Sequence, residues 1–226
     1  MLYKYVAFVI IVHFSFYALN AQKTGCVTGN CKDSIGTFVY PNGNKYEGGF
    51  KNYMLNGNGT FTFNAGMWQG CVYTGSWKNN MMEGTGVFLY ANGDKYEGTF
   101  RKNKINGTGT FYFINGDKYE GEWKDNKCSG TGTFYYNDGK YKGCVFKGEW
   151  NNNKINGQGV FSCENGEKYN GYLKDNMKDG QGTLIFPDGS KYEGFFSNDK
   201  FNGQGCFTYP TGKQVCGKWK NNEIQK

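Results

Sequence analysis

A cassette of about 23 residues recurs along most of this 226-residue chain. Numbered from its opening aromatic residue as position 1, it reads Tyr-Glu-Gly-x-Phe/Trp, a largely polar stretch of six residues, Gly-x-Gly-Thr-Phe-x-Phe/Tyr, and then Pro/Asn-Asp/Asn-Gly. Partial units flank seven full ones, which open at Tyr46, Tyr73, Tyr96, Tyr119, Phe146, Tyr169 and Tyr192. A fixed period of this size is typical of stacked-repeat architectures, in which each repeat contacts only its neighbours.

Both halves of the cassette alternate with the period of a β-strand. Positions 1, 3 and 5 are Tyr, Gly and Phe or Trp, and positions 12, 14, 16 and 18 are Gly, Gly, Phe and an aromatic residue. Alternation of period two places each set on one face of a strand. We expect position 5 opposite 12, 3 opposite 14 and 1 opposite 16, so that glycines make room for the rings. The six residues between the two sets, such as 124–129, are expected to form a polar loop.

The segment between units predicts a tight turn, clearest in Pro41-Asn42-Gly43 and Pro187-Asp188-Gly189. Proline suits the first central place of a type I turn, and glycine takes the left-handed residue that closes it. A three-residue loop keeps position 16 opposite position 1 of the next unit, so all rings share one face. The sequence therefore predicts an all-β fold, a single-layer antiparallel meander of β-hairpins with about seventeen strands.

Two units are four residues longer than the others. They end in the similar segments Gln69-Gly70-Cys71-Val72 and Lys142-Gly143-Cys144-Val145. An even insertion preserves the alternation of the strands, so we expect the sheet to continue past a longer strand or a protruding lip.

Residues 1–21 differ from the repeats. Lys4 precedes a largely apolar stretch, and the small residues Ala18 and Ala21 come before a polar segment. This pattern predicts a secretory signal peptide cleaved after Ala21, with the repeat domain spanning 22–226. An uncleaved anchor is the alternative, but the apolar stretch is shorter than the ~20 residues that span a bilayer. We expect a secreted, periplasmic or envelope-associated protein.

The repeats resemble the MORN (membrane occupation and recognition nexus) family. The resemblance rests on segments such as Tyr96-Glu97-Gly98-Thr99-Phe100 followed by Gly107-Thr108-Gly109-Thr110-Phe111. It covers about residues 25–226 and implies an open solenoid of β-hairpins used for protein assembly and, in some members, for contact with phospholipid head groups. Most familiar members act inside cells, so the predicted export signal is a departure from the family.

The residue types give no sign of catalysis. His13 is the chain's one histidine and lies in the predicted signal peptide, which leaves no imidazole for Ser-His-Asp or Cys-His chemistry. The glutamates at position 2 point away from the rings, and strands rather than helices follow the Gly-x-Gly segments. The cysteines lack paired Cys-x-x-Cys spacing. We expect no enzyme activity, no cofactor, no metal and no small-molecule substrate.

Eight cysteines in an exported chain suggest disulfides, and the expected register selects the pairs. Cys206 at position 15 faces Cys216 at position 2 of the next unit, and Cys144 faces Cys163 at position 18 of its own unit. Directly opposed strand residues lie within disulfide range. No partner is assigned to four further cysteines, which leaves free thiols or intermolecular bonds open for Cys26, Cys31, Cys71 and Cys128.

The basic side chains are almost all lysine, and without Lys4 the net charge is about +6. Arg101 is the single arginine, which argues against recognition of nucleic acid by bidentate contacts. A basic residue begins most polar loops, and the set that could contact anionic lipid is Lys51, Lys78, Arg101, Lys124 and Lys174. A lysine also precedes most opening tyrosines, at Lys45, Lys95, Lys118, Lys168 and Lys191. A solvated edge without a ligand is the alternative.

Taken together, these features predict a non-enzymatic, exported interaction scaffold that binds a protein partner or its own copy. We expect the aromatic face and the exposed ends of the sheet to supply the surface. Two alternatives remain: peripheral binding of anionic phospholipid head groups, and binding of a glycan that stacks on exposed aromatic rings.

Overall fold

The computed structural model describes residues 25–226, so the predicted signal peptide lies outside the described residues. Eighteen β-strands account for most of the described chain. In chain order they are β1 (Cys26–Gly29), β2 (Ile35–Val39), β3 (Lys45–Lys51), β4 (Met54–Thr62), β5 (Val72–Lys78), β6 (Met81–Leu89), β7 (Lys95–Arg101), β8 (Lys104–Tyr112), β9 (Lys118–Lys124), β10 (Lys127–Tyr136), β11 (Cys144–Asn151), β12 (Lys154–Cys163), β13 (Lys168–Lys174), β14 (Met177–Ile185), β15 (Lys191–Ser197), β16 (Lys200–Thr208), β17 (Gln214–Lys220) and β18 (Glu223–Ile224).

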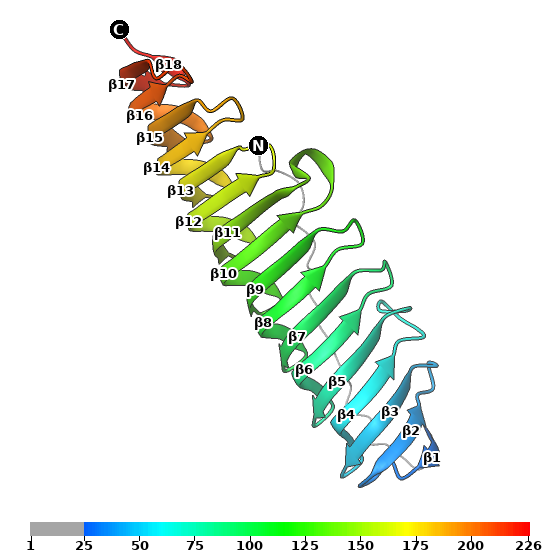
Figure 1. Cartoon of the computed structure of the whole chain (residues 1–226). Helices are drawn as coiled ribbons and strands as arrows, with labels where there is room; N and C mark the ends of the chain where they lie inside the picture. The colour runs from blue at the N-terminus through cyan, green and yellow to red at the C-terminus, as the bar shows by residue number, and fades with distance from the viewer. Residues whose placement is uncertain (1–24) are drawn as a thin grey trace. The chain divides into compact units, whose positions relative to one another are not determined.

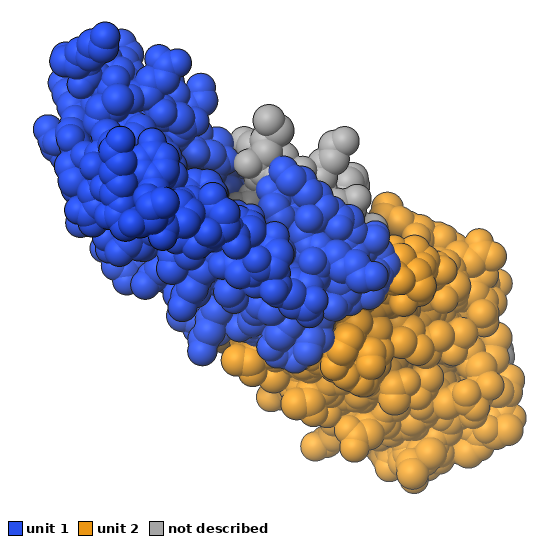
Figure 2. Space-filling view, turned by 45° about the horizontal axis from the view of Figure 1, so that its top comes forward, with its two compact units in different colours: residues 1–9, 115–122, 127–226 blue, residues 10–114, 123–126 orange. Residues whose placement is uncertain are grey.

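The described chain divides into two compact units (Figure 2). One holds residues 25–114 and 123–126, and the other holds residues 115–122 and 127–226. Within each unit, strands that are consecutive in the chain pair with one another, and these pairings are antiparallel (Figure 1). The predicted all-β meander of antiparallel hairpins is confirmed.

Two of the three expected pairings inside a repeat are present. In the hairpin β7–β8, Tyr96 lies opposite Phe111 and Gly98 lies opposite Gly109. Position 5 was expected opposite position 12, and this is wrong: Phe100 lies opposite Ile105 at position 10. The register shifts between Gly98 and Phe100, because Asn106, Gly107 and Thr108 of β8 lie opposite the single residue Thr99 of β7. Strand β8 therefore carries the extra residues of a β-bulge, and Gly107 within it has a φ of 99°.

The expected six-residue polar loop is also wrong. Arg101 pairs with Lys104, and the turn between them holds only Lys102 and Asn103, with φ of 48° and 64°. Two consecutive left-handed residues form the two-residue type I′ turn that matches the twist of a hairpin. The same pair of positive φ angles recurs in each of the other repeats. The polar side chains of this segment therefore lie mostly on strands.

The loop between repeats follows the prediction. The backbone N–H of Tyr40 donates to the carbonyl of Asn44 over 2.8 Å, and the N–H of Gly43 donates to the carbonyl of Tyr40 over 2.8 Å. Gly43 has a φ of 86°, which a residue with a β-carbon rarely adopts. The resulting three-residue loop keeps position 16 opposite position 1 of the next repeat, as in the pair Phe88 and Tyr96.

The rings of positions 1, 5 and 16 form the core. The six tyrosines at position 1 are almost fully buried, and no more than 1% of the surface of each is exposed: Tyr46, Tyr73, Tyr96, Tyr119, Tyr169 and Tyr192. A β-carbon added to Gly98 would collide with the hydroxyl of Tyr96, and one added to Gly109 would collide with both the hydroxyl and the ring. The glycines of positions 3 and 14 therefore provide the space that these rings fill, as expected.

Position 10 completes the core and was missed in the sequence, because it lies in the segment taken for a loop. Its side chain is apolar and buried in most repeats, at Leu55, Met82, Ile105, Cys128, Ile155 and Phe201. Lys178 is the exception, and its ammonium lies 5.5 Å from the centre of the Tyr169 ring. An apolar residue at a constant place in an otherwise polar segment was the signal that could have identified this position.

The two insertions form loops between β4 and β5 and between β10 and β11, and no longer strand spans them (Figure 1). The second contains the 3-10 turn η2 (Gly139–Tyr141). Trp68 packs edge-on against Phe88, and Tyr141 packs edge-on against Phe161. Of the two expected outcomes the lip is the one that forms, and aromatic contacts attach it to the core.

Candidate binding surfaces

The structure pairs the cysteines that the expected register places together. Cys144 lies opposite Cys163 and Cys206 lies opposite Cys216 on neighbouring strands. Both pairs form disulfide bonds, with S–S distances of 2.10 and 2.11 Å. Each bond joins adjacent strands at a different place in the second unit.

A third disulfide, Cys26–Cys31, has an S–S distance of 1.97 Å and was not identified from the sequence. It closes the short segment between β1 and β2. The sequence left free thiols or intermolecular bonds open for these two cysteines, and the structure instead pairs them with each other. Their separation of five residues across a turn containing Gly29, with its φ of 75°, was the available signal.

The remaining cysteines, Cys71 and Cys128, are free and buried. Cys128 occupies the apolar position 10, and burial raises the pKa of its thiol well above the usual range. Cys71 occupies the place of Cys144 in the other long repeat, and burial raises its pKa too. The place of Cys163 is held there by Tyr90, so Cys71 has no opposite cysteine.

The five basic residues singled out for lipid contact lie at the strand ends that lead into the type I′ turns, and all are exposed. Within the first unit, Lys51, Lys78, Arg101 and Lys124 end every second strand of one sheet edge, about 10 Å apart at ~4.8 Å per strand. Lys174 ends a strand of the second unit. We call the four residues of the first unit the basic turn edge.

Many lysines outside the basic turn edge are neutralised by acidic side chains. Four of the five lysines before the opening tyrosine form ion pairs of 2.7–3.1 Å with the glutamate two residues later, namely Lys45, Lys95, Lys118 and Lys191. At the turns, Lys104 pairs with Asp125 over 2.9 Å and holds the pKa of that carboxyl below its usual value. The basic turn edge is therefore the better candidate for binding an anion.

The aromatic face does not supply a surface, contrary to expectation. Its rings bury one another, as in the edge-on contacts of Tyr96 with Phe100 at 5.2 Å and with Trp123 at 5.4 Å. The indole N–H of Trp123 is also satisfied, since it donates to the carbonyl of Gly109 over 3.1 Å. The face available to a partner is the opposite one, which carries positions 2, 4, 13 and 15.

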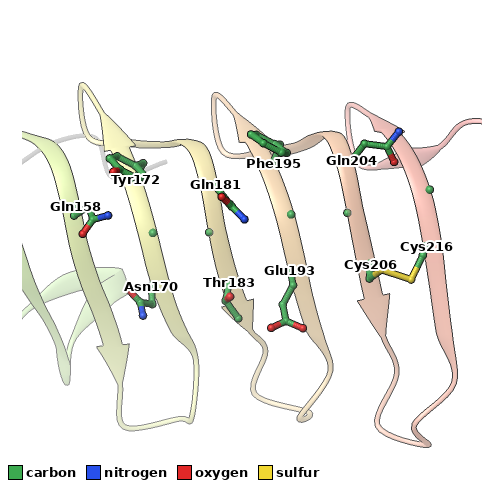
Figure 3. Close-up of a pocket in the computed structure, with 15 residues that line it drawn as sticks. Gln158, Asn170, Tyr172, Gln181, Thr183, Glu193, Phe195, Gln204, Cys206 and Cys216 are labelled. Carbon is green, nitrogen blue, oxygen red and sulfur yellow. A yellow bond between two sulfur atoms is a disulfide. The ribbon is translucent and has the colours of Figure 1, made fainter.

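A groove with a volume of about 770 Å³ lies on this opposite face of the second unit (Figure 3). The glycine backbones of β13 to β17 form its floor. Figure 3 shows Tyr172 and Phe195 at one rim and the Cys206–Cys216 disulfide at the other. Tyr172 and Phe195 are each 48% exposed. None of these groove residues except the cysteines was singled out in the sequence.

Among residues 25–226, no group of three or more His, Cys, Asp or Glu side chains is placed to hold a metal ion. In the same part of the chain, no helix has the length and apolar character needed to cross a membrane.

Comparison with known proteins identifies the repeat. The profile of the MORN repeat matches residues 32–45, 46–68, 73–95, 96–118, 119–141, 146–168, 169–191 and 192–214. These matches reproduce the sequence units, with the long repeats matched over their first 23 residues. No curated protein matches the chain in a sequence search.

The solved structures that match the chain are only distantly similar to it. The TCP10c domain of Drosophila melanogaster Sas-4 is 15% identical, with 86% of this chain and 98% of that one covered and a TM-score of 0.38. The SAS-4 TCP domain of the same species, in complex with a proline-rich motif of Ana2, is 16% identical over 59% of this chain and 72% of that one, with a TM-score of 0.37. Virginiamycin B lyase from Staphylococcus aureus is 12% identical, with 87% of this chain and 74% of that one covered and a TM-score of 0.18. At these TM-scores the similarities carry no information about function.

Proposed function

The chain belongs to the MORN repeat family, and we propose on this basis that it is an exported, non-enzymatic scaffold that holds a protein partner along its sheet. Repeats of this family form non-enzymatic scaffolds that mediate protein or membrane interactions. The export part of the proposal is supported by the three disulfides, because such bonds persist in oxidising compartments.

The surface offered to the partner is the face opposite the rings. Its side chains at positions 2, 4, 13 and 15 are mostly exposed or half-exposed, whereas the ring face is buried. The regular repeat supplies similar contact places along the sheet, so a long partner can bind through several weak contacts at once.

Affinity capture tests the scaffold proposal. The full chain is expressed in an exporting host, and the mature, disulfide-intact protein is used for capture followed by mass spectrometry. We expect the mature chain to begin at Gln22 and to recover one protein, or a second copy of itself, in fixed proportion. A reduced and alkylated sample is the control. An unprocessed chain that stays inside the cell contradicts export, and recovery of lipid alone contradicts the protein scaffold.

A second candidate, binding of an anionic phospholipid surface, is favoured by the basic turn edge. Four exposed cations at one edge can all face a membrane, and each is worth about 1 kcal/mol near an anionic bilayer. Changing Lys51, Lys78, Arg101 and Lys124 to Gln is expected to abolish pelleting with phosphatidylserine vesicles.

The matched control changes Lys45, Lys95 and Lys118 to Gln, because these lysines are already paired with glutamates. The control variant is expected to pellet almost as well as the unchanged chain. Pelleting that resists added salt would count against this candidate, since exposed charges are screened by salt.

A further inference from the structure

One row of side chains on the exposed face changes character in the last repeats. In the first repeats, positions 4 and 13 bond to each other or to nearby backbone: Ser76 to Asn58 over 3.1 Å, and Thr131 to Glu122 over 2.7 Å. In the last repeats position 13 is glutamine, at Gln158, Gln181 and Gln204. These three amides are exposed, and no hydrogen bond within the described chain engages them.

Position 4 becomes aromatic next to these amides. Gln158 lies opposite Tyr172, and Gln181 lies opposite Phe195, so amides and rings alternate along one wall of the groove (Figure 3). Half-exposed rings beside unpaired amides form a surface that can bury apolar groups and also satisfy polar ones.

Both rings stand on fixed backbone. The carbonyl of Tyr172 accepts the phenol of Tyr169 over 2.7 Å, and the carbonyl of Phe195 accepts the phenol of Tyr192 over 3.1 Å. A β-carbon added to Gly203 would lie only 3.0 Å from the β-carbon of Phe195. The absence of a side chain at Gly203 therefore provides the space for the Phe195 side chain. The two rings are therefore presented at a constant separation.

That separation matches one turn of a polyproline II helix. Tyr172 on β13 and Phe195 on β15 are two strands apart, which is about 9.6 Å at ~4.8 Å per strand. Polyproline II has three residues per turn and rises ~3.1 Å per residue, or about 9.3 Å per turn. A chain in this conformation that crosses the strands places residue i on one ring and residue i+3 on the other. Its backbone has no internal hydrogen bonds, so its carbonyls can accept the amide N–H groups of Gln181.

The same row ends in opposite charges. Position 4 on successive odd-numbered strands is occupied by Glu149 on β11, Tyr172 on β13, Phe195 on β15 and Lys218 on β17. Both end residues are exposed. A ligand of this periodicity meets a carboxylate three residues before one proline and an ammonium three residues after the other, which gives the binding a direction.

We propose that this groove binds a proline-rich segment of a partner protein in the polyproline II conformation, with prolines at i and i+3 on Tyr172 and Phe195. A basic ligand residue lies at the Glu149 end and an acidic one at the Lys218 end. This rests on the proposed scaffold function and names the kind of partner that it holds. Aromatic-lined grooves bind such segments well because the ligand is ordered before it binds.

Fluorescence anisotropy of labelled peptides with the mature, disulfide-intact chain tests the proposal. One peptide carries proline at every third residue between a basic and an acidic end, in both charge orders, and the matched peptide carries proline at every fourth residue. We expect the first spacing to bind, with one charge order preferred, and the second to bind at least about tenfold more weakly, because its prolines cannot reach both rings. Tyr172→Thr and Phe195→Thr, which place the residue found at Thr99, are each expected to weaken binding about tenfold or more.

Tyr53→Asn is the matched control. Tyr53 is an exposed tyrosine outside the groove, and asparagine occupies its place in most repeats, so binding is expected to stay unchanged. Circular dichroism and thermal unfolding verify that every variant folds, since both groove rings are half exposed. Equal affinity for the two proline spacings would overturn the proposal, and so would unchanged binding by the double variant that carries both Tyr172→Thr and Phe195→Thr. Binding of a neutral oligosaccharide to the same rings, without any peptide binding, would overturn it as well.

The double variant also separates this proposal from the scaffold proposal. If it still captures the partner recovered by the unchanged chain, the scaffold stands and the groove assignment is wrong. If the unchanged chain captures no protein at all, the scaffold proposal itself is wrong.

Discussion

The phenol of Tyr96 donates a hydrogen bond to the backbone carbonyl of Thr99 over 3.2 Å, opposite the bulge of strand β8. The bulge removes Thr99 from the ladder on one side, and the phenol satisfies the carbonyl instead. The same bond to position 4 forms from position 1 in the other tyrosine repeats, at Tyr46, Tyr73, Tyr119, Tyr169 and Tyr192. Phe146 is the one opening residue of a full repeat that cannot make it.

Phe146→Tyr is therefore expected to stabilise the fold by about 0.5–1.5 kcal/mol, the usual net value of one hydrogen bond. The ring already lies against Gly148 and Gly159, the glycines that accommodate the phenol elsewhere. Tyr73→Phe is expected to cost about 1–3 kcal/mol, because it leaves a part-buried carbonyl unpaired. Urea unfolding measures both, and Tyr209→Phe at an exposed place is the control. Destabilisation by Phe146→Tyr would show that this repeat lacks room for the hydroxyl.

Asn103 connects neighbouring hairpins through both of its polar ends. Its side-chain oxygen accepts the N–H of Met82 over 2.7 Å, and its own N–H donates to the carbonyl of Met82 over 3.1 Å. We expect Asn103→Gly to lose the side-chain bond alone, at about 1–3 kcal/mol. Asn103→Ala should cost about 1–2 kcal/mol more, since alanine disfavours the φ of 64°. Equal unfolding free energies for the two variants would contradict this separation.

Tyr90→Cys is expected to create a fourth disulfide with Cys71. The two places correspond to Cys144 and Cys163 in the other long repeat, which are bonded. Thiol titration under denaturing conditions should count two free thiols in the unchanged chain and one, that of Cys128, in the variant. Three thiols remaining after oxidation, from Cys71, Cys128 and the introduced cysteine, would show that the long repeats differ in geometry. Peptide mapping of the unchanged chain without reduction should find Cys206 linked to Cys216.

Acid is expected to weaken the fold partly through Glu122. Hydrogen bonds from the N–H and the hydroxyl of Thr131 hold the pKa of this carboxyl below its usual value. A lowered folded-state pKa contributes stability above the unfolded pKa of about 4.3, and that contribution is lost as pH falls through the folded pKa. Melting temperatures between pH 6 and 2 should fall less steeply for Glu122→Gln than for the unchanged chain. Glu223→Gln at the exposed β18 is the control, and identical slopes for all three proteins would contradict the prediction.

The parts of the fold that the sequence predicted depend on strict alternation. Tyr, Gly and Phe at positions 1, 3 and 16 have only one arrangement that keeps rings beside glycines, so the pairing of Tyr96 with Phe111 could be predicted. The same register brought Cys206 opposite Cys216.

The type I′ turn and the bulge were not predicted, because a run of polar side chains was interpreted as a loop. Asparagine at position 8 is polar, yet it lies in a type I′ turn with a positive φ and accepts a hydrogen bond from the preceding hairpin, as Asn103 does from the N–H of Met82. The bulge of β8 opposite Thr99 changes the partner of position 5 from position 12 to position 10, and an alternation pattern does not predict such a shift. The groove was missed for a different reason: Tyr172 and Phe195 stand at a place where the other repeats hold unrelated residues, so only the strands show that they form a pair.

The hydrogen bonds between each hairpin and the one before it also bear on the export that we propose. Leu55 and Asn80, which bond through a side chain and the backbone, are 25 residues apart, and Met82 and Asn103 are 21 apart. Contacts this local close small loops and form quickly. Each hairpin can lock onto its predecessor as soon as it emerges from a translocation channel, so an exported chain of this kind need not wait for its C-terminus before it resists proteases.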